Sequence, residues 1–241
     1  IGPSPTQQSY LNQARLLAVA RESGADAVHP GYGFLSENAD FAEAVQRQGL
    51  CFIGPSPRWI RELGHKTQAR AFMAGQGMPQ AASSPVLASS DEALAAAARI
   101  GYPVLVKPAG GGGGIGMLPA RDAQEARPVG IPEAQLADMR LLLSGLLARI
   151  GYDVIGTVEM LYTPQDGFVF LEMNTRLQVE HAVTEEITGI DIVEAQIRLA
   201  AGMHMRQVLP GPMQASGHAI EARIYAEDPV RFLPSPGPLG R

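Results

Sequence analysis

The feature that most constrains the fold is an alternating stretch, Phe168–Glu180, with the sequence FVFLEMNTRLQVE. Every second residue of its latter part is polar: Glu172, Asn174, Arg176, Gln178 and Glu180. Because an extended strand sends successive side chains to opposite faces, one face is predicted to be apolar and the other to carry acids, amides and a cation. The alternative interpretation is an exposed strand with a solvated outer face.

The preceding segment favours a functional interpretation. A second strand is predicted at Ile155–Tyr162, and Thr163–Gly167 has the composition of a hairpin turn. Folding at this turn places Glu159 opposite Glu172, and like charges directly opposite one another destabilise a sheet. A divalent cation between them would reverse that effect, with Asn174 as a further oxygen ligand, and oxygen ligands are those that Mg²⁺ accepts. The hairpin therefore predicts a metal and anion site.

Composition narrows the class of protein. The chain has 241 residues, of which 46% are hydrophobic and 18% charged, as in ordinary globular proteins. Its net charge of −5 favours neither nucleic acid nor an anionic membrane surface as a partner. No segment has the length of an apolar membrane span, and the single cysteine, Cys51, is predicted to be a buried strand thiol. We expect a cytoplasmic protein that binds neither membrane nor nucleic acid.

The first sixty residues alternate between helix and strand, which favours a parallel sheet with flanking helices. Helices are predicted at 9–23 and 38–48, and strands at 25–29 and 50–53. The loop His29–Asn38 has the sequence HPGYGFLSEN and follows a strand, at the sheet edge where such folds usually bind ligands. Ser36 and Asn38 are candidate helix caps. A plain connecting turn is the alternative.

A glycine run is the second candidate site. A helix at 61–79 is followed by an alanine-rich helix at 90–101, capped by Ser90 or Asp91, and by a strand at 103–107. Five glycines then allow backbone N–H groups to surround phosphate oxygens. They are Gly110, Gly111, Gly112, Gly113 and Gly114. The run fits neither a Walker loop nor a dinucleotide fingerprint, so we predict a phosphate-covering loop beside Lys107, although linkers share this composition.

The remaining chain is predicted to be mainly helical. Helices are expected at 130–149, with leucines on one face, and at 184–187 and 190–201, and a linker at 203–217. Residues 218–227 alternate strictly between apolar and polar, which predicts a strand with Arg223 on its charged face.

Four motifs together resemble biotin carboxylase, the ATP-grasp component of biotin-dependent carboxylases. They are HPGYGFLSENADF (His29–Phe41), the lysine and glycine segment Val104–Met117, EMNTRLQVEHAVTE (Glu172–Glu185) and GHAIEARIYAEDP (Gly217–Pro229). The resemblance implies a mixed α/β and α+β fold in three parts. These parts are a truncated Rossmann-like pre-ATP-grasp domain at 1–60, an ATP-grasp domain at 61–210 and the start of a biotin carboxylase C-terminal domain at 211–241.

The resemblance also implies roles for individual residues. Lys66, Lys107 and the glycine loop would hold ATP, and Leu161 would contact adenine. Glu159, Glu172 and Asn174 would bind Mg²⁺ or Mn²⁺.

The bicarbonate and biotin pocket is implied in the same way. Arg176, Gln178 and the backbone of Val179 would bind bicarbonate. Glu180 would be the general base and Arg223 would stabilise the biotin enolate. Tyr32 would lie in the loop that faces this pocket.

Three features depart from the family. Ile115 stands where the family commonly has a basic residue, and His65 stands where Asp or Ser is more usual. The family also has a lid subdomain where Glu125 and Ala126 are adjacent here. A disordered lid and a true deletion remain as alternatives at this junction.

The function expected from the resemblance is ATP- and bicarbonate-dependent carboxylation of biotin on a carrier protein. The expected partners are that carrier and a carboxyltransferase, in a homodimer or a larger carboxylase complex. The acceptor that is carboxylated downstream is not indicated. The alternative is a non-catalytic nucleotide-binding or interaction protein without a lid, and an unrelated ATP-grasp ligase is a more distant third.

Overall fold

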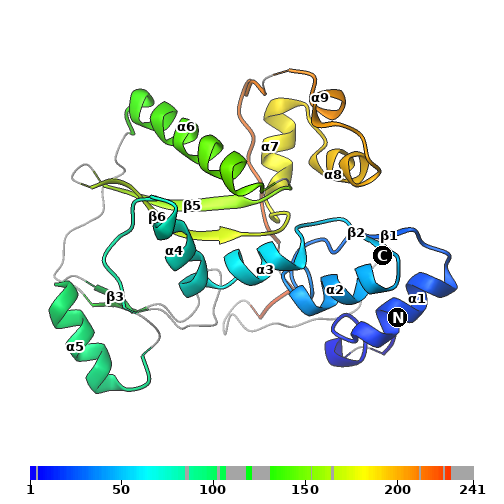
Figure 1. Ribbon diagram of the computed structural model, residues 1–241, viewed down its shortest axis with the longest axis horizontal. Coiled ribbons are helices and arrows are strands. Elements are labelled where there is room, and N and C mark those ends of the chain that lie inside the picture. Colours follow the sequence, from blue (N-terminus) through cyan, green and yellow to red (C-terminus); the bar gives the residue numbers. More distant parts are fainter. Residues whose placement is uncertain are drawn as a thin grey trace. The chain divides into compact units, whose positions relative to one another are not determined.

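The computed structural model of the chain contains two compact units, residues 1–178 and 179–241, which are described separately. It describes residues 1–3, 5–84, 87–101, 104–106, 118–120, 131–152, 154–163, 166–211, 213–224 and 226–228 (Figure 1). Several predicted features lie outside these residues: Lys107, the glycine loop Gly110–Gly114, Ile115 and the Glu125–Ala126 junction.

The first part of unit 1 alternates between helix and strand as predicted. After a 3₁₀ turn (η1, Thr6–Gln8), its elements are α1 (Gln13–Glu22), β1 (Ala27–Val28), α2 (Ala39–Arg47) and β2 (Cys51–Phe52). β1 and β2 pair in parallel, with Ala27 opposite Cys51, so the predicted parallel pairing is confirmed. Asn38 caps α2 by accepting a hydrogen bond of 2.8 Å from the backbone N–H of Phe41. Cys51 of β2 is half-buried, and not fully buried as predicted.

A small core holds this part together. On α2, residues 41, 42 and 45 share one face and are almost fully buried against Phe52 of β2. Phe41 meets Phe52 edge-on, with ring centroids 6.2 Å apart, a favourable aromatic geometry. The core fixes the start of α2 and therefore the end of the loop that precedes it.

The single helix predicted at 61–79 is wrong, because two helices occupy this region. α3 (Pro57–Leu63) ends at Gly64, and α4 (Lys66–Gly75) begins two residues later. Gly64 donates a hydrogen bond to the carbonyl of Ile60, and a Cβ there would lie 2.5 Å from that same oxygen. A glycine is therefore required at the end of α3, and the break places Lys66 at the first position of a new helix.

The hairpin at the centre of unit 1 brings Glu159 and Glu172 together as predicted. β5 (Thr157–Thr163) pairs with β6 (Gly167–Asn174) in antiparallel fashion, and Glu159 lies directly opposite Glu172. An irregularity between Glu159 and Met160 shifts the register beyond this pair.

The predicted strand extends too far, because β6 ends at Asn174. Its partner β5 begins at Thr157, which is opposite Asn174, so the ladder ends where the partner ends. The alternation of burial nevertheless continues: Thr175 and Leu177 are buried, whereas Arg176 and Gln178 are half-buried. The alternation therefore predicted the burial of residues 175–178 correctly, but the prediction that they continue the strand is wrong.

A second core lies against the hairpin. Phe170 of β6 is fully buried among Met73 of α4, Leu146 of α6 and Trp59 of α3. α3 contributes to both cores, since its Ile60 belongs to the first. The remaining elements of unit 1 are α5 (Ser90–Ile100), β3 (Val104–Val106), β4 (Leu118–Ala120), which pairs with β3 in antiparallel fashion, and α6 (Glu133–Ile150), whose Leu146 belongs to this core. The cap of α5 is Ser89, and not Ser90 or Asp91 as expected.

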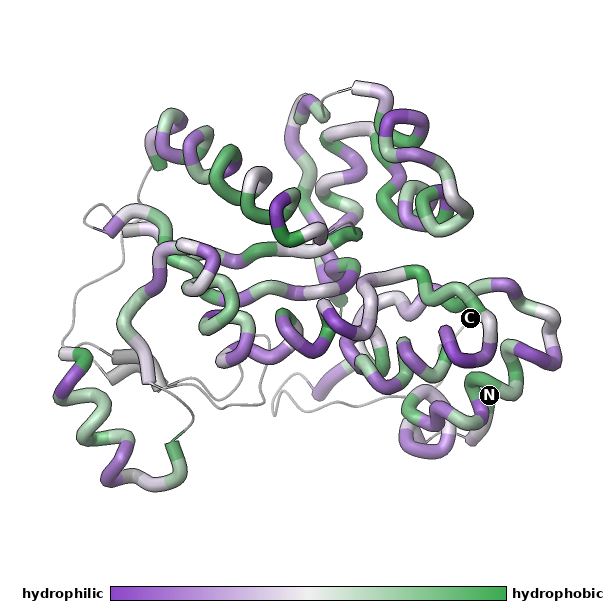
Figure 2. The backbone as a smooth tube through the Cα atoms, viewed as in Figure 1, coloured by the Kyte–Doolittle hydropathy of each residue, from purple (hydrophilic) through white to green (hydrophobic). Residues whose placement is uncertain are grey.

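The leucines of α6 do not all share one face. Leu143, Leu146 and Leu147 pack against the second core, whereas Leu141 is 72% exposed and Leu142 is also exposed. Figure 2 colours several consecutive residues of α6 as hydrophobic. Residues 141–143 are three consecutive leucines, which cannot all lie on one side of a helix.

Unit 2 contains α7 (His181–Thr188), α8 (Ile192–Ala200) and α9 (Met205–Val208). The linker predicted at 203–217 therefore includes a short helix. The strand predicted at 218–227 is wrong: among the described residues of this segment only one forms an isolated bridge, and Ile220 and Ile224 are almost fully exposed. An alternating sequence forms a strand only beside a partner, and no strand is described in this unit. None of the described helices is long and apolar enough to cross a membrane.

Candidate active site

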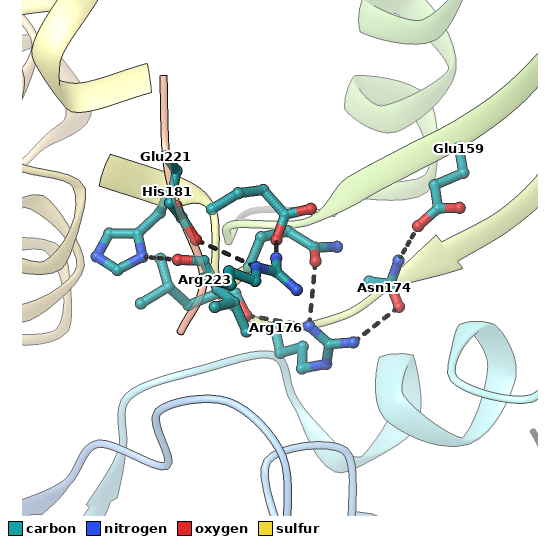
Figure 3. Close-up of polar contacts among 10 residues, drawn as sticks. Glu159, Asn174, Arg176, His181, Glu221 and Arg223 are labelled. Atoms are coloured by element: carbon teal, nitrogen blue, oxygen red, sulfur yellow. Dashed lines mark hydrogen bonds and ion pairs between the residues drawn. The ribbon is translucent and has the colours of Figure 1, made fainter. Parts of the chain in front are cut away.

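Two carboxylates face each other in the hairpin: one pairs with a cation and the other accepts a hydrogen bond from an amide. The ammonium group of Lys66 lies 3.1 Å from a carboxylate oxygen of Glu172, and the side chains are 34% and 20% exposed. The amide of Asn174 donates a hydrogen bond of 2.7 Å to Glu159 (Figure 3). The helix break at Gly64 makes the first contact possible, because it brings Lys66 to the start of α4, which packs on β6.

The donor set fits Mg²⁺ in its chemistry. Glu159, Glu172 and Asn174 supply oxygen atoms, and Mg²⁺ usually takes one or two carboxylates and completes its shell with water and phosphate. No cluster of three or more His, Cys, Asp or Glu side chains suited to a metal occurs in the described part of the chain, so a complete protein cage is absent there. The oxygen of Asn174 faces Arg176, and its amide must turn to reach a cation shared with the carboxylates.

Arg176 connects the parts of this site. Its Nε donates to Glu37 at 2.9 Å. Its two terminal nitrogens donate to Asn174 at 3.2 Å, to Gln178 at 3.3 Å and to the carbonyl of Leu177 at 3.2 Å (Figure 3). The side chain is only 20% exposed. A guanidinium held by four acceptors in a half-buried position is a fixed positive charge.

Glu37 is a residue to which the sequence assigned no role. One of its carboxylate oxygens accepts the backbone N–H of Thr175 at 3.1 Å, and the other accepts Nε of Arg176. The available signal was its position beside the predicted cap Asn38, in the loop already singled out as a ligand site. Its partner 139 residues away could not be found from local patterns.

Unit 2 contains a second arginine that is held by acids. Arg223 pairs with Glu180 and, through Nε at 3.1 Å, with Glu221 (Figure 3). The residues that were predicted as the base and as the biotin-stabilising cation are therefore in direct contact. Glu221 was missed, although its spacing of two residues from Arg223 puts both on the same side of an extended segment. His181 approaches the carbonyl of Val179 at 3.2 Å.

For the other predicted site residues, the structure gives side-chain exposure and backbone geometry. Leu161 is 48% exposed on β5, and Tyr32 is 47% exposed in the loop before α2. Glycines 31 and 33 of this loop have positive φ angles, and Gly31 donates a hydrogen bond to Nδ1 of His29. His65 precedes α4 without capping it through its side chain. The remaining candidates, Lys107 and the glycine loop, lie outside the described residues.

Family models define the class of protein. Residues 1–60 match the biotin carboxylase N-terminal domain. Residues 65–140 and 129–208 match the ATP-binding domain of the carbamoyl-phosphate synthase L chain. With the paired carboxylates and the lysine, these matches define an ATP-dependent ligase of the ATP-grasp type.

The relatives identify the family. The chain is 39% identical to the biotin carboxylase of Haemophilus influenzae, over 98% of this chain and 67% of that protein. It is 40% identical to the biotin carboxylase of Halalkalibacterium halodurans, over 100% of this chain and 68% of that protein. Its fold matches the biotin carboxylase domain dimer of the Hydrogenobacter thermophilus 2-oxoglutarate carboxylase in complex with MgADP, ADP and bicarbonate. That match has a TM-score of 0.84 and 32% identity, and covers 100% of this chain and 69% of that one. The chain belongs to the biotin carboxylase family.

Proposed function

We propose that this chain catalyses the ATP- and bicarbonate-dependent carboxylation of biotin on a carrier protein, by way of carboxyphosphate. The observation that carries the proposal is that a member of the biotin carboxylase family holds Glu159 opposite Glu172, with Lys66 paired to the second acid. Two acids beside a lysine supply the charges that a metal-bound triphosphate requires, which supports the proposal.

The first half-reaction activates bicarbonate. Lys66 would release Glu172 and bind phosphate oxygens, while Arg176 and Gln178 would bind and orient bicarbonate for attack on the terminal phosphate. Glu180 would remove the bicarbonate proton. A bound Mg²⁺, held by Glu159, Glu172 and Asn174, would neutralise charge on the phosphates. Phosphoryl transfer depends mainly on such positioning and charge neutralisation.

The second half-reaction transfers CO₂ to biotin. Carboxyphosphate would break down to CO₂ and phosphate, the phosphate would accept the proton of the ureido nitrogen of biotin, and that nitrogen would attack the carbon of CO₂. Arg223 would stabilise the negative charge on the ureido oxygen. The contacts of Arg223 with Glu180 and Glu221 support this role, because they hold the guanidinium beside the base that starts the reaction.

The partners, location and domain limits are proposed with this function. A biotin carrier and a carboxyltransferase would complete the carboxylase, in a homodimer or a larger complex, in the cytoplasm. A boundary near residue 60 and another near residue 210 would separate the three domains. The dimer of the Hydrogenobacter thermophilus domain supports a dimeric arrangement.

A second function is favoured by one observation. The alignments with the two relatives extend over 304 and 308 positions, although this chain has 241 residues, so those proteins contain residues without a counterpart here. A chain that lacks its lid could bind nucleotide without catalysis, because closure over ATP excludes water and completes the site.

One pair of measurements separates the two functions. Purified chain is assayed for phosphate release from MgATP with and without bicarbonate, and MgADP binding is measured by thermal shift. Bicarbonate-dependent cleavage supports the ligase. Binding without bicarbonate-dependent cleavage favours the non-catalytic protein. Absence of both contradicts both functions.

A further inference from the structure

Glu37 holds the cation of the anion pocket from a distant part of the chain. Its carboxylate bridges two donors on consecutive residues, the backbone N–H of Thr175 at 3.1 Å and Nε of Arg176 at 2.9 Å. Thr175 is fully buried, and the Arg176 and Glu37 side chains are 20% and 31% exposed. A bidentate acceptor in a half-buried position fixes both the backbone and the guanidinium, because each donor would otherwise lose a hydrogen bond.

Glu37 is itself held in place. Ser36, the residue before it, is buried, and Asn38, the residue after it, caps α2. Two backbone turns, Ser36 to Gly33 at 3.0 Å and Asn38 to Leu35 at 3.1 Å, fix the loop on either side. The carboxylate is therefore presented from a rigid point of the fold, and it can determine where Arg176 lies.

Arg176 needs a support of this kind because it lies just beyond the end of the β5–β6 ladder. The β5–β6 ladder ends at Asn174, so residues 175–178 have no strand pairing to fix their backbone. The Glu37 contact to Thr175 provides a backbone hydrogen bond immediately after the ladder ends. We propose that Glu37 is a positioning residue that orients Arg176 for bicarbonate. This inference rests on the proposed function.

The contacts of Arg176 indicate which ligand the loss of Glu37 should affect most. Nε and one terminal nitrogen are taken by Glu37 and Asn174, so the guanidinium plane is fixed along that edge. Loss of Glu37 would allow the plane to rotate and would weaken the anion pocket. Lys66 pairs with Glu172, whereas Glu37 accepts from Thr175 and Arg176, so we expect nucleotide binding to change much less.

The kinetic test uses Glu37→Gln, which keeps the shape but has one oxygen for two donors, and Glu37→Asp, which keeps the charge. For Glu37→Gln we expect the KM for bicarbonate in ATP cleavage to rise by about 10-fold or more, with the KM for MgATP changed by less than about 2-fold. Glu37→Asp should recover part of the loss. The control is Glu43→Gln, which removes one of the two acidic partners of Arg61 on the exposed side of α2. An unchanged bicarbonate KM, or an equal rise in both constants, overturns the inference.

A second measurement does not depend on turnover. In ¹⁵N-labelled protein, the Nε–H signal of Arg176, assigned with Arg176→Lys, should be protected from exchange in the wild type and in Glu43→Gln, and lost in Glu37→Gln. A bicarbonate titration followed on the Gln178 side-chain amide should need about 10-fold more anion in Glu37→Gln. Equal protection or equal affinity overturns the inference even in a folded, inactive chain, whereas absence of ATP cleavage in the wild type contradicts the proposed function alone.

Discussion

Glu159 and Glu172 lie directly opposite one another across the β5–β6 hairpin. Two acids at such a position are unfavourable unless a cation or a donor compensates them, and here Lys66 and Asn174 do so. Two acids that need such compensation are typical of a site that binds a cation. The first prediction tests whether Glu172 belongs to a metal site.

Glu172→Gln should abolish bicarbonate-dependent ATP cleavage, because the variant removes one of two carboxylates from the proposed Mg²⁺ site. It should also remove the increase in melting temperature that MgADP produces in the wild type. The matched control is Glu62→Gln, which affects an exposed pair with Arg58. Near-normal cleavage in Glu172→Gln would exclude this residue from the metal site.

Arg223→Ala should separate the two half-reactions. ATP cleavage should persist, whereas carboxylation of free biotin should fall by about 10²-fold or more, the usual effect of losing one charge-stabilising donor. Both reactions are measured on the same preparation, with Arg198→Ala as the control on the exposed surface of α8. An equal decrease of both activities would contradict the division of roles.

Glu180→Gln should stop both reactions, because bicarbonate that keeps its proton is not activated for attack. The variant keeps the size of the side chain, so a loss of activity is not explained by a cavity. Circular dichroism checks that α7, which begins at the next residue, is retained. If Glu180→Gln cleaved ATP at the wild-type rate, another group would have to be the base.

Phe170→Ala should destabilise unit 1 by about 3–5 kcal/mol, because it leaves a large cavity in a fully buried position of the second core. The free energy of unfolding is measured with urea. Leu141→Ala on α6 is the control, since this side chain is 72% exposed and its loss should change stability by less than about 0.5 kcal/mol. Similar values for the two variants would mean that Phe170 does not lie in the core described.

Arg70→Met tests a polar support of the same core. The guanidinium donates to the carbonyls of Phe170 at 2.9 Å and Ala81 at 2.7 Å, and burial lowers the pKa of Arg70 from its ordinary value. Removing the donors should cost about 1–3 kcal/mol in urea unfolding, because half-buried acceptors lose their partners. Arg15→Met, which loses only an exposed pair with Glu22, should have little effect. A smaller loss for Arg70→Met than for Arg15→Met would contradict this role.

The sequence by itself determined the local order of the fold and much of the site. Alternation and turn composition predicted the hairpin and the opposition of Glu159 and Glu172, because strand periodicity and turn position are read from neighbouring residues. The register shift between Glu159 and Met160, which produces this opposition in the structure, was not predicted. The side chain of Asn38 could be predicted as a helix cap because capping also depends only on a few neighbouring residues.

Only the tertiary structure decided the features that depend on distant partners. Alternation at 218–227 predicted a strand, but a strand requires a neighbour that local sequence does not specify. The division of the helix at Gly64 was missed because the glycine could be tolerated within a helix as well as end one. The contact between Glu37 and Arg176 joins two segments 139 residues apart, and chain folding alone brings them together. The alternation of side chains and the composition of a turn are local properties of the sequence. A charge pair between distant residues, such as Glu37 and Arg176, depends instead on which surfaces come into contact when the two cores form.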